Sequence, residues 1–180
     1  MYKPSLVGAL VAASGTRRRT LIMAAGNLQI RQALSVAEVG AARGLFEEYA
    51  AALGIDLGYQ GFADELAGLP GSYTPPRGRL LVAWVDGEAA GCVGLRAMDG
   101  DVCEMKRLYV RPAFRGNGVG KLLAEAIVAE ARAIGYAVMR LDTVPKLAAA
   151  TRLYESLGFV RRDAYYETPV VGTMFMELRL

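Results

Sequence analysis

The stretch that decides the fold is Arg115-Gly116-Asn117-Gly118-Val119-Gly120-Lys121, which lies between apolar runs at residues 104–110 and 119–134. The first run has the composition of a strand, and the second has the spacing of an amphipathic helix. Glycines let backbone N–H groups turn toward a common point, and a helix N-terminus there favours an anion. Arg115 and Lys121 add positive charge. The stretch therefore predicts a phosphate-binding loop.

Two common phosphate-binding loops do not fit this stretch. A P-loop requires Ser or Thr after Gly-Lys, but Leu122 follows Gly120-Lys121. A dinucleotide-binding fold requires G-x-G-x-x-G after the first strand of a β-α-β unit, whereas this loop spells G-x-G-x-G and follows three antiparallel strands. A glycine-rich turn without a ligand is the remaining alternative. The strand and helix on either side, with two flanking cations, favour the anion site.

The composition excludes several classes of function. The chain has 180 residues and no histidine, which excludes Ser-His and Cys-His nucleophiles and His-ligated metal sites. Cys92 and Cys103 have no metal-ligand spacing and make no disulfide framework. We therefore expect no metal, and reduced thiols that suit a cytoplasmic protein. No apolar run approaches the roughly 20 residues of a membrane-spanning helix, so no membrane partner is expected.

Residues 1–27 differ from the rest of the chain. Four of the 21 basic residues and no acidic residue lie there, which leaves 17 basic against 18 acidic residues in the remainder. We interpret residues 1–27 as an N-terminal extension that is either disordered or the product of a start codon placed too early, in preference to a weak signal-like pattern. Residues 28–180 form one domain. Because that domain is nearly neutral, no nucleic-acid partner is expected.

Hydrophobic periodicity and turn residues predict a mixed α/β sheet. Strands are expected at residues 28–33, 79–85, 88–98, 101–110, 136–143, 159–166 and 172–180. Helices are expected at residues 36–53, 119–134 and 146–157, with a short one around Phe62. The first helix begins at a capping box formed by Ser35 and Glu38 and ends at Gly54.

The three central strands form an antiparallel meander. Asp86-Gly87 and Asp99-Gly100 are typical hairpin turns. If the second turn has two residues, Cys103 faces Arg96 and Cys92 faces Arg107. The helix at residues 119–134 then requires a right-handed crossover that places strand 136–143 parallel to strand 101–110.

Three stretches make the chain resemble the Gcn5-related N-acetyltransferase (GNAT) family. They are Leu108-Tyr109-Val110-Arg111-Pro112, Arg115 to Gly120, and Leu153-Tyr154-Glu155-Ser156-Leu157-Gly158-Phe159. The last two match the family patterns (Arg/Gln)-x-x-Gly-x-(Gly/Ala) and Leu-Tyr-x-x-x-Gly-Phe in order and spacing. The resemblance covers residues 28–180. It implies an acyl-CoA N-acyltransferase (GNAT) fold with a V-shaped cofactor cleft between strands 101–110 and 136–143.

The resemblance also implies where the co-substrate acetyl-CoA binds. Its pantetheine arm should pair with the strand backbone, and its pyrophosphate should sit on the glycine loop. The implied residues are Leu108, Tyr109, Val110, Arg115, Gly116, Asn117, Gly118, Val119, Gly120 and Lys121. One departure is Leu147, which stands where many members carry a pantetheine-binding Asn; Thr143 is a candidate for the lost contact.

The resemblance implies two catalytic residues. Tyr154 matches the family tyrosine that protonates the CoA thiolate, with core packing as its alternative role. Glu104 stands where some members carry a general base, with a structural or acceptor-binding role as its alternative. The N–H of Leu108 is the expected oxyanion donor.

The acceptor is expected to be the amine of a small molecule. Glu104 favours a cationic amine and Arg107 a carboxylate-bearing one, so an amino-acid-like acceptor is allowed. Further candidates for the acceptor site are Tyr59, Phe62, Tyr165 and Tyr166. A protein amine, another acyl donor, O-acetylation and a non-catalytic acyl-CoA sensor stay open as alternatives. Dimers are common in the family, so a homodimer also stays open.

Overall fold

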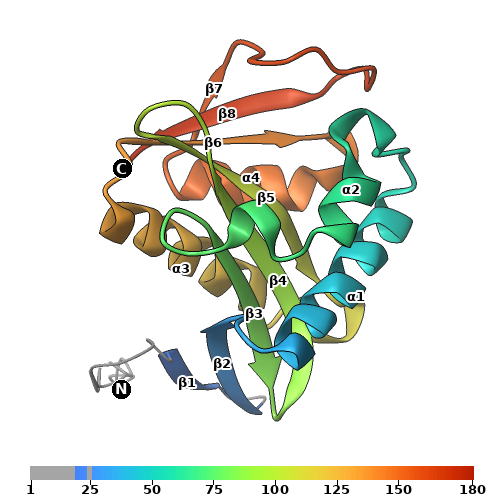
Figure 1. Ribbon diagram of the computed structural model, residues 1–180, viewed down its shortest axis with the longest axis vertical. Coiled ribbons are helices and arrows are strands. Elements are labelled where there is room, and N and C mark those ends of the chain that lie inside the picture. The colour runs from blue at the N-terminus through green and yellow to red at the C-terminus, as the bar shows by residue number, and fades with distance from the viewer. Residues whose placement is uncertain (1–18, 24–25) are drawn as a thin grey trace, which may run out of the picture.

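The computed structural model describes residues 19–23 and 26–180, which form one mixed sheet covered by helices on both faces (Figure 1). The strand order is β1-β2-β3-β4-β5-β6-β8-β7. The strands are β1 (Arg19–Met23), β2 (Gly26–Gln32), β3 (Arg79–Val85), β4 (Glu88–Ala97), β5 (Val102–Val110), β6 (Val138–Thr143), β7 (Val160–Arg162) and β8 (Met174–Arg179). The helices are α1 (Val36–Leu53), α2 (Phe62–Ala67), α3 (Val119–Ile134) and α4 (Ala148–Ser156). The predicted fold class is confirmed.

The first strand begins within the segment that the sequence assigned to an extension. β1 pairs antiparallel with β2, with Leu21 opposite Leu28. Residues 1–18 and 24–25 lie outside the described part of the chain, and the interpretation of residues 1–27 as an N-terminal extension stays a prediction. Within the described part, no helix is long and apolar enough to cross a membrane.

The helices divide the core into two layers. α1 and α2 lie on one face, where Leu45 and Phe46 are fully buried against Tyr73. α3 and α4 lie on the other face, where Leu123 and Ile127 are fully buried. The capping box of α1 is confirmed: Glu38 N–H donates to Ser35 Oγ at 3.2 Å, and Ser35 N–H donates to Glu38 Oε2 at 3.1 Å.

The second hairpin turn differs from the two-residue alternative. Met98 N–H donates to the carbonyl of Val102 at 2.9 Å, so three residues form the turn, and Cys103 faces Ala97 rather than Arg96. Cys92 faces Tyr109 rather than Arg107, because the longer turn and a register shift between Cys92 and Gly94 each move the pairing by one residue. Both cysteines are free and buried.

The crossover creates the opening that positions the site. β5, α3 and β6 follow one another, and β5 and β6 are parallel neighbours, as predicted. They pair only at Val102–Glu104 with Val138–Arg140, after which the two strands separate. β6 stays paired with β8 along its whole length. β5 therefore continues to Val110 without a partner on its β6 side.

Because β4 contacts β5 closely at Gly91, replacement of this glycine should destabilise the fold. A Cβ built at Gly91 would lie 2.5 Å from the carbonyl oxygen of Tyr109, whereas one at Gly44 in α1 meets nothing within 4 Å. We expect Gly91→Ala to lower the free energy of unfolding by at least ~1–3 kcal/mol. Gly44→Ala, the control, should leave it unchanged or raise it by roughly 0.5–1 kcal/mol. Urea denaturation measures the free energy of unfolding of both variants. A Gly91→Ala variant as stable as wild type would show that β4 and β5 can move apart to accept the added methyl group.

Candidate active site

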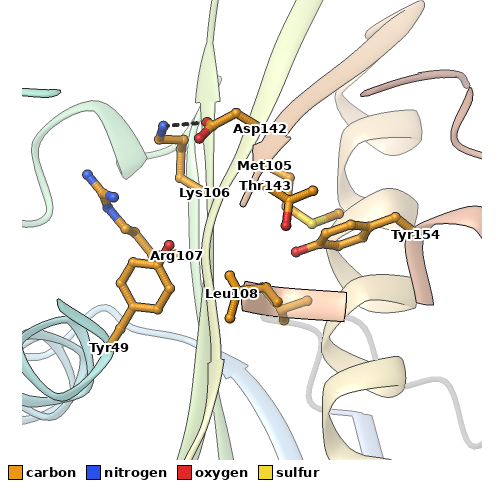
Figure 2. Close-up of a pocket in the computed structure, with 9 residues that line it drawn as sticks. Tyr49, Met105, Lys106, Arg107, Leu108, Asp142, Thr143 and Tyr154 are labelled. Atoms are coloured by element: carbon orange, nitrogen blue, oxygen red, sulfur yellow. Dashed lines mark hydrogen bonds and ion pairs between the residues drawn. The ribbon is translucent and has the colours of Figure 1, made fainter. Parts of the chain in front are cut away.

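The candidate site begins where β5 and β6 separate. Two residues beyond the last strand pair, Lys106 Nζ and Asp142 Oδ1 form a 3.0 Å ion pair across the gap. Figure 2 shows this pair at the gap, with Arg107 and Tyr49 on one side of β5 and Tyr154 on the other. A cavity of about 20 Å³ passes between the strands and reaches residues on both sides. Its lining is Tyr49, Met105, Lys106, Arg107, Leu108, Asp142, Thr143, Leu147 and Tyr154.

A larger groove of about 560 Å³ continues from this cavity along the free side of β5. Its walls are the end of β5, the glycine loop, the start of α3, the C-terminal end of α1 and the face of α4. Nine of the ten cofactor-binding residues predicted from the sequence line it; Asn117 does not. Those nine are Leu108, Tyr109, Val110, Arg115, Gly116, Gly118, Val119, Gly120 and Lys121.

The glycine loop presents free N–H groups to this groove. Gly116 and Gly118 have φ angles of 80° and 78°, in the left-handed region that favours glycine. Gly118 caps α3 without a side-chain hydrogen bond. Leu122 N–H is the first to reach a helix carbonyl, that of Gly118, at 3.0 Å. The N–H groups of residues 119–121 therefore have no partner within the helix and can receive an anion.

The cations at the groove lie on both walls. Arg115 Nε donates to the carbonyl of Val110 at 2.8 Å, so this guanidinium is folded back along β5. Lys121 is largely exposed and its Nζ lies 3.8 Å from Glu125. Lys146, on the opposite wall, donates to the carbonyls of Ala52 and Leu53 at 3.1 and 2.9 Å. The sequence did not single out Lys146, because no local pattern shows that α1 and α4 meet there.

Tyr154 lines the small cavity from α4. Its ring is buried 5.8 Å from that of Phe159, and its hydroxyl points into the gap between the strands (Figure 2). Burial raises the pKa of Tyr154 well above the usual range of a tyrosine, and the charges of Tyr49 and Asp142 raise it further. The phenol is therefore protonated at neutral pH and can act as a proton donor.

Glu104 is placed differently from Tyr154. Only 1% of it is exposed, and both of its oxygens are engaged: Oε2 accepts from Arg96 Nε at 2.7 Å, and Oε1 accepts from the Tyr165 hydroxyl at 2.8 Å. Lys106 Nζ lies 3.8 Å away. Glu104 lines neither the small cavity nor the groove. The geometry therefore does not bring the two predicted catalytic residues together at one cavity.

The predicted acceptor-site residues gather on the α1–α2 side of β5. Arg107 Nε and Nη2 bind Glu65 at 3.0 and 2.6 Å, and the guanidinium lies 4.9 Å from the ring centre of Phe62. Burial alone would raise the pKa of Glu65, but Arg107 holds it below its usual value. Tyr165 and Tyr166 pack edge to face with Phe175 at 5.0 Å each.

Gln60 connects these groups, although sequence reasoning missed it. Its Nε2 donates to the hydroxyls of Tyr59 and Tyr166 at 3.1 and 3.2 Å. Its Oε1 accepts from Arg107 Nη1 at 2.9 Å and from Lys106 Nζ at 3.4 Å. No motif marks a glutamine in a short loop, so its partners could be found only in the folded chain.

The comparisons with known proteins agree with this geometry. The model of the Acetyltransferase (GNAT) family matches residues 44–159. An uncharacterised N-acetyltransferase of Schizosaccharomyces pombe is 43% identical over 138 residues, which are 76% of this chain and 85% of that protein. This chain belongs to the GNAT family of acetyltransferases. It is therefore an enzyme of the acetyl-CoA-dependent acyltransferase class.

Solved structures show the same fold. A GNAT-family acetyltransferase from Staphylococcus aureus superimposes with a TM-score of 0.71 at 17% identity and covers 84% of this chain and 98% of its own. YncA from Salmonella typhimurium, solved with its cofactor acetyl-CoA, superimposes with a TM-score of 0.59 at 25% identity. That match covers 84% of this chain and 93% of YncA.

Proposed function

We propose that this enzyme transfers the acetyl group of acetyl-CoA to the amine of a small molecule by direct attack of the amine on the thioester. The observation that carries the proposal is that the groove at the glycine loop adjoins the small cavity lined by Tyr154, since Tyr49, Leu108 and Leu147 line both. Its volume of about 560 Å³ suits an extended donor. The two free cysteines are compatible with the cytoplasmic location proposed from the sequence.

The chain offers two kinds of donor contact along this groove. Beyond Glu104, β5 has no strand partner on its β6 side, so its backbone groups can pair with the amides of a pantetheine arm as with an added strand. Farther on, the free N–H groups at the start of α3 can hold a pyrophosphate. In this proposal the donor runs along the groove from the glycine loop to residues 108–110 of β5. Acetyl-CoA supplies the activated acyl group at the end of that path.

The residues at the gap have distinct roles in this proposal. The amine nitrogen bonds to the acetyl carbon as the carbon–sulfur bond breaks, and the Tyr154 hydroxyl donates a proton to the leaving thiolate. The N–H of Leu108 stabilises the oxyanion. Formation of the amide removes a proton from the attacking nitrogen, and this proton restores the Tyr154 hydroxyl. An acceptor that enters as an ammonium ion therefore releases one further proton in the net reaction. Glu104 is the proposed base for that proton; because its oxygens are occupied, it would act through a bridging water.

Release of CoA thiol with a panel of amines tests the proposal. Turnover with at least one small amine is the expected result. Tight acetyl-CoA binding without turnover on any small amine, peptide amine or alcohol would contradict it and favour a sensor. Turnover restricted to peptide amines or to alcohols would support the proposed donor site but would contradict a small-molecule amine as the acceptor.

Gly118→Val should weaken acetyl-CoA binding about tenfold. A β-branched residue is strained at φ 78°, at a cost of roughly 1–3 kcal/mol, so the loop would leave the conformation that presents its N–H groups. Gly100→Val is the matched control, because Gly100 also has a positive φ, of 65°, but lies in a hairpin turn away from the groove. Calorimetry should show a higher dissociation constant only for the first variant. Equal affinities would refute the loop as the donor site.

A further inference from the structure

A bulge in β5 turns two consecutive cations toward the same group. Side chains of neighbouring residues in a regular strand point to opposite faces. Arg107, however, has a φ of 57°, and the pairing with β4 shifts at this place. Lys106 and Arg107 consequently both contact Gln60. A positive φ is uncommon and strained for an arginine. A strained Arg107 beside the gap between β5 and β6 therefore points to a functional use of this conformation.

The carboxamide oxygen of Gln60 lies between these two cations. Gln60 Oε1 is 2.9 Å from Arg107 Nη1 and 3.4 Å from Lys106 Nζ. Two converging cationic donors suit a carboxylate oxygen better than a neutral amide, because hydrogen bonds between charged groups are about twice as strong. Gln60 itself is the last residue of a one-turn 3-10 helix, Gly58–Gln60, between α1 and α2. Displacement of its side chain would break four side-chain hydrogen bonds but would not interrupt an α-helix or a strand.

The surrounding charges are balanced without a ligand. Six ionised side chains form this cluster, three of each sign, and each cation has an anionic partner within 3.0 Å. The pairs are Arg96 with Glu104, Lys106 with Asp142, and Arg107 with Glu65. A buried net charge is costly unless it is compensated. A zwitterion adds no net charge to the cluster, whereas a simple alkylamine cation adds one.

We propose that the acceptor is a small amino acid, whose carboxylate replaces Gln60 Oε1 between Lys106 and Arg107. This inference rests on the proposed N-acetyltransferase function and names the class of its acceptor. Lys106 and Arg107 line the same small cavity as Tyr154, so a carboxylate held there leaves a nearby amine facing the gap between β5 and β6. The product is then an N-acetyl amino acid together with free CoA thiol.

Matched acceptor sets test the inference with the wild-type enzyme. Each set contains an amino acid, its carboxamide and the amine that lacks the carboxyl group, and thiol release gives kcat/KM for each. We expect the amino acid to exceed both analogues by about tenfold to a hundredfold, the range of one or two charge-assisted hydrogen bonds. Equal or better turnover of the analogues would overturn the inference and leave the N-acetyltransferase function standing. No turnover with any amine would overturn both.

Substitutions of Gln60 separate ligand displacement from a structural role. Gln60→Glu places a permanent carboxylate between the two cations, so the preference for the amino acid over its carboxamide should fall at least tenfold. Gln60→Ala leaves both cations available and should keep that preference. Gln60 does not line the donor groove, so calorimetry should show unchanged acetyl-CoA affinity in both variants. If Gln60 has only a structural role, each variant should lower the kcat/KM of the amino acid and of its carboxamide by the same factor. The preference would then be unchanged in Gln60→Glu, and this result would overturn the inference.

Discussion

Replacing Tyr154 with Phe should lower kcat by at least tenfold while acetyl-CoA affinity stays within about twofold of wild type. The substitution removes only the hydroxyl that points into the gap and keeps the ring against Phe159. General acids contribute roughly 10²- to 10⁴-fold when no other donor replaces them. Burial raises the pKa of Tyr154, so the phenol of the wild-type enzyme stays protonated as the pH rises. Deprotonation of Tyr154 should therefore not lower wild-type activity between about pH 7 and 10.

Tyr136→Phe is the control for this experiment. Its hydroxyl donates to the carbonyl of Arg77 at 2.8 Å, and the residue lines neither the cavity nor the groove. The control should therefore keep the wild-type kcat even if it loses some stability. Steady-state thiol release gives kcat, and calorimetry gives donor affinity. Wild-type turnover in Tyr154→Phe would assign the residue to packing alone.

Glu104→Ala should lower the free energy of unfolding by about 3–5 kcal/mol. Loss of the buried member of an ion pair leaves the other charge uncompensated. Here Arg96, whose side chain is 37% exposed, loses its 2.7 Å partner, the buried Lys106 loses a carboxylate 3.8 Å away, and the Tyr165 hydroxyl loses its acceptor. Urea denaturation measures the change. Glu125→Ala is the control, because its i,i+4 pair with Lys121 is exposed and should contribute only about 0–1 kcal/mol. Similar losses in both variants would contradict the argument.

Glu104→Gln distinguishes the base from a structural carboxylate. The amide keeps the shape of the side chain and one acceptor oxygen, so more of the fold should survive than in Glu104→Ala. A fall in kcat of a hundredfold or more in a folded Glu104→Gln enzyme would identify Glu104 as the base. A fall of less than tenfold would identify it as a support for Arg96 and Tyr165.

Local signals were enough to predict several elements of the fold from the sequence. α1 begins after Ser35 and ends before Gly54, because the capping box and the left-handed glycine are encoded within a few residues of each end. α3 likewise begins at the glycine loop and ends before Gly135, as predicted. The parallel placement of β5 and β6 followed from the handedness of crossovers rather than from any single residue.

The details of the acceptor side depended on contacts that local patterns do not encode. Arg107 and Glu65 are 42 residues apart, and Lys106 and Asp142 are 36 residues apart. With a two-residue turn, the sequence predicted that Arg107 lies opposite Cys92. The turn has three residues and β5 has a bulge at Arg107, which together change the register of β4 and β5 and the direction of the Arg107 side chain. From the sequence, Glu104 and Arg107 were treated as unpaired charges, whereas each forms an ion pair in the folded chain.

The separation of β5 and β6 has a consequence for aggregation. An unpaired strand edge exposes N–H and C=O groups that can pair with any extended chain, and this molecule carries such an edge inside its sheet, from Met105 to Val110. If the donor pairs there, the loaded enzyme has no such edge, while the empty enzyme does. A cellular supply of donor would then protect the protein from strand addition between copies as well as supporting its turnover.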